Sequence, residues 1–361
     1  MTPRRIRVQE LSGTPYQMGV QHGRAHRDTI RAFAEERVRL AGESAWAGRD
    51  VPREEVLALA EACVSAHRRY SPALTEELAG MAAATGLTLA ELVVVGGFTD
   101  FIDTVYGAAK GAAAPSAADN CTAFLVPNAR AALGSGFLGQ TWDMHAGATP
   151  HVILLRGAPA GAPPFLAFST VGCLGMIGMN ALGVAVGINN LLGADGRVGV
   201  TWPFVVRQML TCSEADEALE VLLEAPLAGA HNYLILDAAG RGFNVEATST
   251  THHVTPLAGE ALVHTNHCLA GVTRAAERVR DPLSQASSER RLADAQALLS
   301  GDGITAEDLQ ALTRDERAIC LRPAPPKFVE TCGAAIMRPA TGDFWAVWGL
   351  PSENAYEHFR V

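Results

Sequence analysis

The chain has 361 residues, of which 48% are hydrophobic and 19% are charged. This composition supplies ample material for a buried core and excludes global disorder. The formal net charge is −9, and no Lys/Arg cluster interleaved with aromatic residues offsets it. We therefore expect no nucleic-acid partner.

The first residues are basic, but the polar sequence that follows lacks the apolar stretch of a secretion signal. No segment reaches membrane-spanning length without Gly, Pro or charge. We therefore expect no membrane association and a cytoplasmic location. The seven cysteines are widely spaced, odd in number and without a CxxC pair. This pattern argues against a disulfide framework and against a structural zinc site.

Residues 13–92 have the pattern of helices, with Leu74, Leu78 and Met81 at helical spacing. Gly86 is expected to end one helix. Thr88, followed three positions later by Glu91, predicts a capping box that opens the next helix. The first 100 residues are therefore expected to be mainly helical.

An Ala/Gly-rich stretch without large apolar residues lies between Tyr106 and Asn120. Such a composition predicts an exposed, mobile linker. Processing sites concentrate in segments of this kind, but ordinary loops share the composition. The stretch alone thus favours cleavage only weakly.

Beyond the linker the hydrophobic period changes to that of strands separated by turn residues. The expected strands cover residues 121–126, 136–142, 152–156, 165–171 and 184–190, followed by a hairpin of 232–237 with 242–247, two more strands near 262–265, and a terminal hairpin of 334–338 with 344–348. A cap at residues 213–216 predicts a helix to about Leu223, and further helices are expected at 287–299 and 306–312. The order indicates an α+β protein with antiparallel sheets covered by helices.

Cys121 stands where the linker gives way to the first of these strands. By burial statistics it reads as an ordinary small apolar residue. If the Asn120–Cys121 bond were cut, however, one residue would carry both a nucleophilic sulfur and an α-amine able to activate it. The residue alone does not decide between these readings.

Seven motifs follow one another from Gly13 to Asn354. They are Gly13-Thr14-Pro15-Tyr16-Gln17-Met18-Gly19-Val20-Gln21-His22-Gly23, Cys121-Thr122-Ala123-Phe124, Gly139-Gln140-Thr141-Trp142-Asp143, Gly178-Met179-Asn180-Ala181-Leu182-Gly183-Val184, His231-Asn232-Tyr233-Leu234, His264-Thr265-Asn266-His267 and Gly349-Leu350-Pro351-Ser352-Glu353-Asn354. In their order and spacing the chain resembles the penicillin acyltransferase family of N-terminal-nucleophile hydrolases, the group of acyl-coenzyme A:6-aminopenicillanic acid acyltransferase.

The resemblance implies a four-layer αββα sandwich and self-cleavage between Asn120 and Cys121. Residues 1–120 would form a mainly helical α chain, and residues 121–361 would form the catalytic β chain. The cleaved N-terminal chain would remain the partner in an αβ heterodimer. The substrate would be a small-molecule acyl amide or acyl donor, for instance an acylated amine or amino acid, and neither a metal nor an organic cofactor would be needed.

The resemblance also assigns roles. Cys121 would be the nucleophile and, through its freed amine, the base. Asp143 would orient both groups, and Asn266 would donate to the oxyanion, with Asn190 as a second donor from a related bile-salt-hydrolase-like branch. The other readings are a turn aspartate at 143, a strand-end asparagine at 266 and an Asx turn at 190.

Four further residues are expected to bind substrate. Phe101 and Tyr106 lie in the aromatic segment before the linker, where the N-terminal chain would line an apolar acyl pocket, although they fit a helix core equally well. Thr122 follows the nucleophile. His231 is expected to line the cleft, with a satisfied core histidine as its equal alternative.

Two residues depart from the family pattern. Asn120 stands before the cut, where glycine is commoner, so its side chain could slow the attack. Gln140 stands where the bile-salt-hydrolase branch has an arginine, which favours the acyltransferase branch. Two other functions remain open: an unprocessed binding protein without catalysis, and a cysteine hydrolase that works uncut with His231 or His264 as its base.

Overall fold

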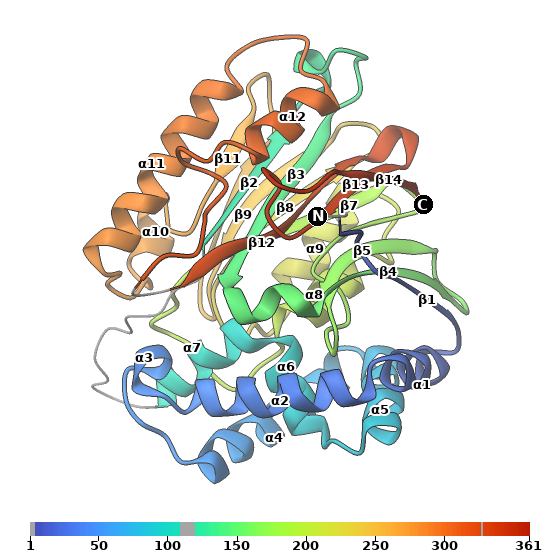
Figure 1. Ribbon diagram of the computed structural model, residues 1–361, viewed down its shortest axis with the longest axis vertical. Coiled ribbons are helices and arrows are strands. Elements are labelled where there is room, and N and C mark those ends of the chain that lie inside the picture. Colours follow the sequence, from blue (N-terminus) through green and yellow to red (C-terminus); the bar gives the residue numbers. More distant parts are fainter. Residues whose placement is uncertain (1–3, 109–119, 326–327) are drawn as a thin grey trace.

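The computed structural model describes residues 4–108, 120–325 and 328–361. Two β-sheets lie face to face with helices outside them, and a group of N-terminal helices covers one end of this sandwich (Figure 1). The linker expected between Tyr106 and Asn120 falls mostly outside the described residues. Only its beginning is described, and there the last N-terminal helix continues to Ala108.

The larger sheet has eight strands in the order β1-β4-β5-β6-β7-β8-β9-β10. Their bounds are β1 Val8–Gly13, β4 Val152–Pro159, β5 Phe165–Thr170, β6 Ile177–Asn180, β7 Val184–Asn190, β8 His231–Asp237, β9 Gly242–Ala247 and β10 His252–Pro256. Neighbouring strands are antiparallel except for β1, which pairs in parallel with β4. The expectation of purely antiparallel sheets was wrong at this edge, because a strand from the N-terminal part joins the sheet.

The smaller sheet has six strands in the order β11-β2-β3-β12-β13-β14, and all its pairs are antiparallel. The bounds are β11 Leu262–His264, β2 Asn120–Val126, β3 Phe137–His145, β12 Val329–Arg338, β13 Asp343–Trp348 and β14 Glu357–Arg360. Strands β2 and β3 pack against β7 and β8 of the larger sheet. The apolar inner faces of both sheets therefore form one buried core.

Helices form the two outer layers. Helices α8 (Trp202–Met209) and α9 (Ala215–Leu223) pack on the larger sheet. On the smaller sheet lie α11 (Pro282–Leu298) and α12 (Ala306–Thr313), and a short helix α10 (Gly271–Arg274) contacts β10. The order helix, sheet, sheet, helix confirms the expected four-layer αββα sandwich.

The remaining helices precede the sandwich in the chain. They are α1 Pro15–Ala25, α2 Arg27–Ala41, α3 Ser44–Ala47, α4 Arg53–Tyr70, α5 Pro72–Thr85, α6 Leu89–Gly96 and α7 Phe98–Ala108. The capping box of Thr88 with Glu91 is present at the start of α6, as predicted. The cap expected at residues 213–216 was wrong in detail, because Glu214 is the N-cap of α9 and Ser213 instead bonds the Glu217 carboxylate.

Among the described helices, none alone is long and apolar enough to cross a bilayer. Helices α5 and α6 together have the length and composition of such a span, but they are bent by 109° relative to each other.

Candidate active site

Cys121 is the second residue of β2, which lies between the edge strand β11 and β3 in the smaller sheet. The register with β3 places Cys121 opposite Trp142 and Asn120 opposite Asp143. Because side chains alternate along a strand, Cys121 and Trp142 face one side of the sheet while Asn120 and Asp143 face the other. The thiol faces the space between the two sheets, where it shares a cavity with Ile188 and Asn190 of β7.

This cavity, here called the Cys121 cavity, is narrow. Its free volume of about 10 Å³ admits roughly one water molecule. The lining residues are Arg37, Gly96, Thr99, Cys121, Trp142, Met144, Thr170, Met176, Ile188, Asn190, Trp202 and His231. Since Arg37, Gly96 and Thr99 belong to α2, α6 and the start of α7, the N-terminal helices help to enclose the thiol.

Asn266 lies just beyond β11 and contacts Cys121 directly. The backbone N–H of Cys121 donates to Asn266 Oδ1 at 2.8 Å, and Asn266 Nδ2 donates to the carbonyl oxygen of Asn190 at 3.1 Å. The main chain of Asn266 is held by Ser288 of α11, whose Oγ accepts its N–H at 2.9 Å. The structure thus brings together Cys121, Asn190 and Asn266, three of the four residues expected to be catalytic.

The fourth, Asp143, is fully buried on β3. Its register partner is Asn120, so its carboxylate lies on the face of the smaller sheet that α11 covers. There it stands near the guanidinium of Arg291. Burial lowers the pKa of Arg291 to about 10, and the negative charges of Asp143 and of a Cys121 thiolate act in the opposite direction. The guanidinium therefore remains charged at neutral pH.

Arg291 is the main contact that sequence reasoning missed. It is fully buried on α11 and donates through Nη1 to the Cys121 carbonyl oxygen and, at 3.1 Å, to Thr122 Oγ1. Its Nη2 donates to Asn120 Oδ1 at 3.1 Å and to Asn266 Oδ1 at 2.9 Å. A signal existed in the sequence, because this arginine occupies a helical stripe of otherwise small buried residues: Ser284, Ser288, Arg291 and Ala295.

His231 is part of a buried polar network at the rim of the Cys121 cavity. Its Nδ1 lies 2.8 Å from Asp100 Oδ1, and its Nε2 lies 3.0 Å from Thr99 Oγ1. Trp202 ties this network together, since its indole N–H donates to Thr99 Oγ1 and its backbone N–H to Asp100 Oδ2. His231 therefore lines the cavity while its ring nitrogens face α7.

The other expected substrate-binding residues lie elsewhere. Phe101 is fully buried in the helical core, and Tyr106 lies under the guanidinium of Arg278 at 4.3 Å. Neither lines the Cys121 cavity. Thr122 faces α11 through its contact with Arg291. From the segment expected to line an acyl pocket, only Thr99 lines the Cys121 cavity.

Gln140 connects the two sheets through its side chain. Its side chain reaches from β3 to the main chain of Ile188 on β7, where Oε1 accepts the Ile188 N–H at 2.7 Å and Nε2 donates to the Ile188 carbonyl oxygen. It thereby ties the two sheets together beside Asn190 and does not line the Cys121 cavity.

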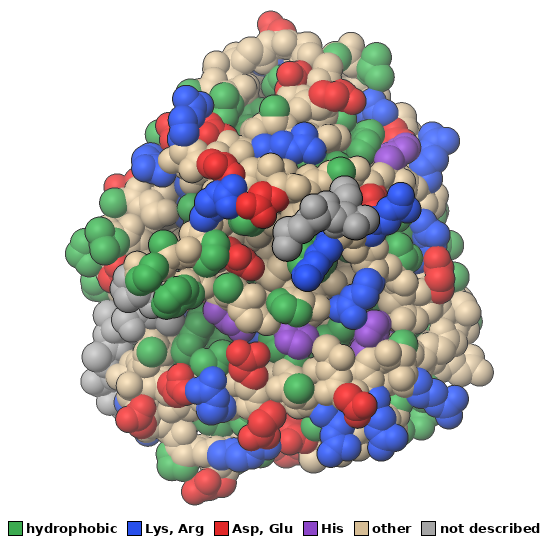
Figure 2. All heavy atoms as spheres, in the orientation of Figure 1, with side chains coloured by type: hydrophobic (Ala, Val, Ile, Leu, Met, Phe, Trp, Pro, Cys, Tyr) green, Lys and Arg blue, Asp and Glu red, His purple; other side chains and the backbone are tan. Residues whose placement is uncertain are grey.

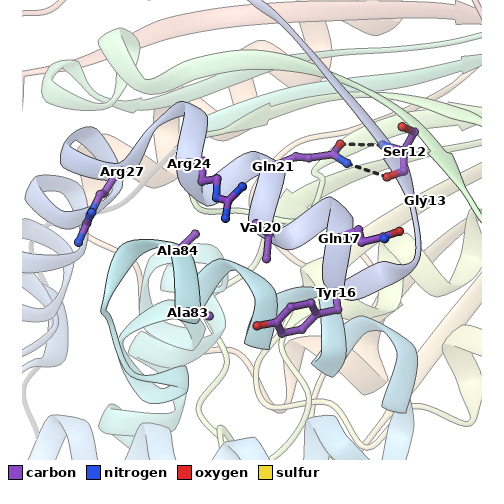
Figure 3. Close-up of a pocket in the computed structure, with 10 residues that line it drawn as sticks. All are labelled: Ser12, Gly13, Tyr16, Gln17, Val20, Gln21, Arg24, Arg27, Ala83 and Ala84. Atoms are coloured by element: carbon purple, nitrogen blue, oxygen red, sulfur yellow. Dashed lines mark hydrogen bonds between the residues drawn. The ribbon is translucent and has the colours of Figure 1, made fainter.

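A larger pocket of about 890 Å³ lies on the surface between α1, α5 and the end of β1 (Figure 3). Its lining is mainly polar, and Gln21 is tied to the backbone of Ser12 there. It contains no cysteine, and its basic residues are Arg24 and Arg27. The only cysteine among the residues lining these two cavities is Cys121.

In the part of the chain that the structure describes, neither surface charge nor a group of metal-ligating side chains indicates a further site. Acidic and basic side chains are interspersed over the face shown in Figure 2, without an extended field of one sign. Within residues 4–108, 120–325 and 328–361, no three His, Cys, Asp or Glu side chains are grouped to hold a metal ion. All seven cysteines are buried and free of disulfide bonds.

A four-layer αββα sandwich that carries a buried cysteine at the start of a central strand is the architecture of the N-terminal-nucleophile hydrolases. Comparison with protein families agrees with this class. Residues 131–353 match the family model described as acyl-coenzyme A:6-aminopenicillanic acid acyl-transferase. This match spans well over half of the chain, which therefore belongs to that family and is an enzyme of the hydrolase/acyltransferase class.

Individual relatives were also found. The chain is 26% identical over 307 residues to the 40 kDa form of acyl-coenzyme A:6-aminopenicillanic-acid-acyltransferase from Emericella nidulans, covering 84% of this chain and 80% of the relative. Among solved structures, a mutant of conjugated bile acid hydrolase from Clostridium perfringens is similar with a TM-score of 0.44 and 12% identity, over 67% of this chain and 97% of that one. Penicillin V acylase from Agrobacterium tumefaciens has a TM-score of 0.40 and 11% identity, over 67% and 86% of the two chains.

Proposed function

We propose that the protein is a self-cleaving cysteine amidohydrolase or acyltransferase whose nucleophile is Cys121. It would act on a small acylated amine or amino acid, through an acyl-cysteine intermediate. Residues 1–120 would stay bound to residues 121–361 as an αβ heterodimer. The observation that supports this most is the contact of the Cys121 backbone N–H with Asn266 Oδ1 beside a buried cavity that the thiol lines.

Self-cleavage would proceed by an N-to-S acyl shift. The Cys121 thiol attacks the carbonyl carbon of Asn120, the C–S bond forms as the C–N bond breaks, and the thiol proton passes to the departing nitrogen. Water then hydrolyses the thioester, which leaves a carboxylate on Asn120 and restores the thiol. The new α-amine has an ordinary pKa of about 7.7 to 8.0, against about 8.5 for a thiol, so it can serve as base near neutral pH.

Asp143 would hold this amine. In the uncut chain the carboxylate stands opposite Asn120, which becomes the free end once the bond is cut. Asp143 then faces the new amine from the neighbouring strand. A buried carboxylate in this position would hold the amine and favour its protonated form.

Turnover would repeat the same chemistry on substrate. The thiolate attacks the acyl carbon, and the leaving amine takes the proton that the Cys121 amine received from the thiol. Water or an acceptor amine then takes the acyl group. Asn266 would stabilise the oxyanion through Nδ2. That Nδ2 donates to the carbonyl oxygen of Asn190, a residue that lines the Cys121 cavity.

The test compares wild type, Cys121→Ala and the control Cys212→Ala, since Cys212 is another buried free thiol. Mass spectrometry under denaturing conditions is combined with turnover of acyl amides, acyl amino acids and β-lactams, each with and without an acceptor amine. We expect wild type and the control to give two chains and turnover, while Cys121→Ala stays intact and inactive. Cleavage of Cys121→Ala, or an intact wild type without thiol labelling at Cys121, would contradict the proposal.

A second candidate is a cysteine hydrolase that works uncut with His231 as its base. It is favoured by the 2.8 Å approach of His231 Nδ1 to Asp100, which resembles the way a carboxylate orients a catalytic imidazole. This candidate predicts turnover by an intact chain and loss of turnover in His231→Gln. His264 is less suited to this role, because it does not line the Cys121 cavity, whereas His231 does.

A further inference from the structure

Arg291 contacts both residues that flank the bond between Asn120 and Cys121. On the N-terminal side, Nη2 donates to the side-chain oxygen of Asn120 at 3.1 Å. On the C-terminal side, Nη1 donates to the carbonyl oxygen of Cys121. A planar guanidinium holds both partners in a fixed relative geometry, which a flexible ammonium does not.

The same guanidinium fixes the amide of Asn266. Asn266 Oδ1 accepts from Arg291 Nη2 at 2.9 Å and from the Cys121 N–H at 2.8 Å. With two donors aimed at this atom, the oxygen must face them and the Nδ2 group must point the other way, toward Asn190. Arg291 therefore determines where the amide hydrogens of Asn266 point.

Asn120 departs from the family pattern, in which glycine is commoner before the cut. Its side chain is largely buried, and its oxygen meets the buried charge of Arg291. In a desolvated site a hydrogen bond to a charged group is stronger than one between neutral groups. The side chain that the sequence suggests as an obstacle to cleavage thus has a defined partner.

From these contacts we propose that Arg291 is a positioning residue for self-cleavage, and that Asn120 is the anchor through which it holds the scissile bond in place. The inference rests on the proposed function. Attack requires the thiol of Cys121 and the carbonyl carbon of Asn120 to keep a near-attack geometry. Fixing both residues to one buried guanidinium restricts rotation about the backbone bonds between them.

The experiment follows the decay of freshly produced, uncut chain by intact mass spectrometry. Wild type is compared with Asn120→Ala, Arg291→Lys, the double variant and the control Arg290→Lys, since Arg290 is exposed on the same helix. Asn120→Ala should cleave about 10- to 100-fold more slowly, the loss expected for one hydrogen bond to a charged group. Arg291→Lys keeps the positive charge but removes the planar guanidinium with its paired N–H donors, so it should slow cleavage at least as much.

The cleavage rate of the double variant distinguishes a positioning role from a purely structural one. Because Asn120 acts through Arg291, the double variant should cleave no more slowly than Arg291→Lys alone, while independent effects would multiply. The control should cleave at the wild-type rate. If Arg291→Lys does not fold, as shown by near-UV circular dichroism, the loss of rate in Asn120→Ala alone decides the result.

The possible failures are distinguishable. A wild-type chain that stays intact would overturn the proposed function together with this inference. A wild type that cleaves, with Asn120→Ala cleaving at the same rate, would overturn the inference alone. Multiplicative losses in the double variant would likewise show that Asn120 and Arg291 act separately.

Discussion

At the residue scale, the Asn266 side chain joins three parts of the site. Its oxygen contacts the backbone of Cys121 and the guanidinium of Arg291, while its nitrogen holds the carbonyl oxygen of Asn190. The main chain beneath it is fixed by Ser288, and Arg280 donates to its carbonyl oxygen. Few degrees of freedom are left to this amide, as a preformed oxyanion donor requires.

Replacing Asn266 by alanine tests this role. Asn266→Ala should lower kcat by about 10²- to 10³-fold, the usual effect of losing one oxyanion donor, with a smaller change in KM. Steady-state kinetics of fully cleaved enzyme measure the split. As a control, Asn128→Ala removes an amide that bonds Gly136 and Ala239 near the surface and should leave kcat unchanged. An effect confined to KM would speak against oxyanion stabilisation.

Sequence reasoning proposed Cys121, Asp143 and Asn266 because each lies in a recognisable motif, and Asn190 because it ends an apolar strand; their catalytic roles stay predictions. It did not find Arg291, whose only signal in the sequence is a charged side chain among the small residues on the buried face of α11. It assigned Phe101 and Tyr106 to the pocket, whereas the residue of α7 that lines the cavity is Thr99. The rotation of a helix about its axis decides such cases, and composition alone does not specify it.

At the element scale, the crossing of α1 and α5 depends on glycine. A Cβ added to Gly19 would lie 1.7 Å from the carbonyl oxygen of Glu77, and one added to Gly80 would lie 2.1 Å from that of Tyr16. The two helices therefore approach each other more closely than side chains permit. The carboxylate of Glu77 also pairs with buried Arg207 on α8, at 2.9 Å, so α5 links α1 to the outer layer of the sandwich.

A side chain at this crossing should push the helices apart. Gly19→Ala should destabilise the protein by about 1–3 kcal/mol, the usual cost of overpacking a close contact. Gly271→Ala is the control, because no atom lies within 4 Å of its added Cβ. Urea unfolding measures the difference. Equal stability of Gly19→Ala and Gly271→Ala would mean that the crossing tolerates a methyl group.

Element boundaries show where local sequence is informative. The capping boxes of Thr88 and Thr305 mark the starts of α6 and α12 correctly. Helix α11 begins at Pro282, with Asp281 as its cap, although the apolar pattern predicted a start at Ser287. Strand β6 was not predicted, since four residues that include a glycine give too short a pattern. Caps are local signals, whereas short strands depend on their neighbours in the sheet.

At the scale of the whole molecule, the helical part and the sandwich are joined through buried polar contacts. His67 of α4 receives the Thr201 backbone N–H on Nε2 at 3.1 Å and lies 2.7 Å from the Cys63 carbonyl oxygen through Nδ1. These partners fit a neutral ring with its proton on Nδ1. Burial lowers the pKa of His67 from 6.5 to about 4. Such contacts would hold residues 1–120 in place after a cut.

This lowered pKa has a consequence for stability. Between pH 6.5 and 4 the unfolded chain binds a proton at His67 and the folded chain does not, so stability falls as the pH falls through this window. His67→Gln should flatten the pH dependence of unfolding there by up to about 1.4 kcal/mol per pH unit. The control is the exposed residue His253, replaced by Gln. An unchanged slope in His67→Gln would show that this ring is not kept neutral.

The strand order was not predictable from the sequence. Periodicity identified most strands that follow residue 120, but the sheet places β2 between β11 and β3, and the β11 pairing joins residues as distant in sequence as Ala123 and His264. The parallel pairing of β1 with β4 likewise spans the N-terminal helices. Such long-range contacts depend on the complementarity of whole faces, which a local pattern does not contain.

N-terminal sequencing of the purified protein tests the central claim most directly. The account predicts two N-termini in equal amounts, one from the start of the chain and one that reads Cys-Thr-Ala-Phe from Cys121. A single N-terminus after prolonged incubation, or a second one at any other residue, would contradict a catalytic amine on Cys121.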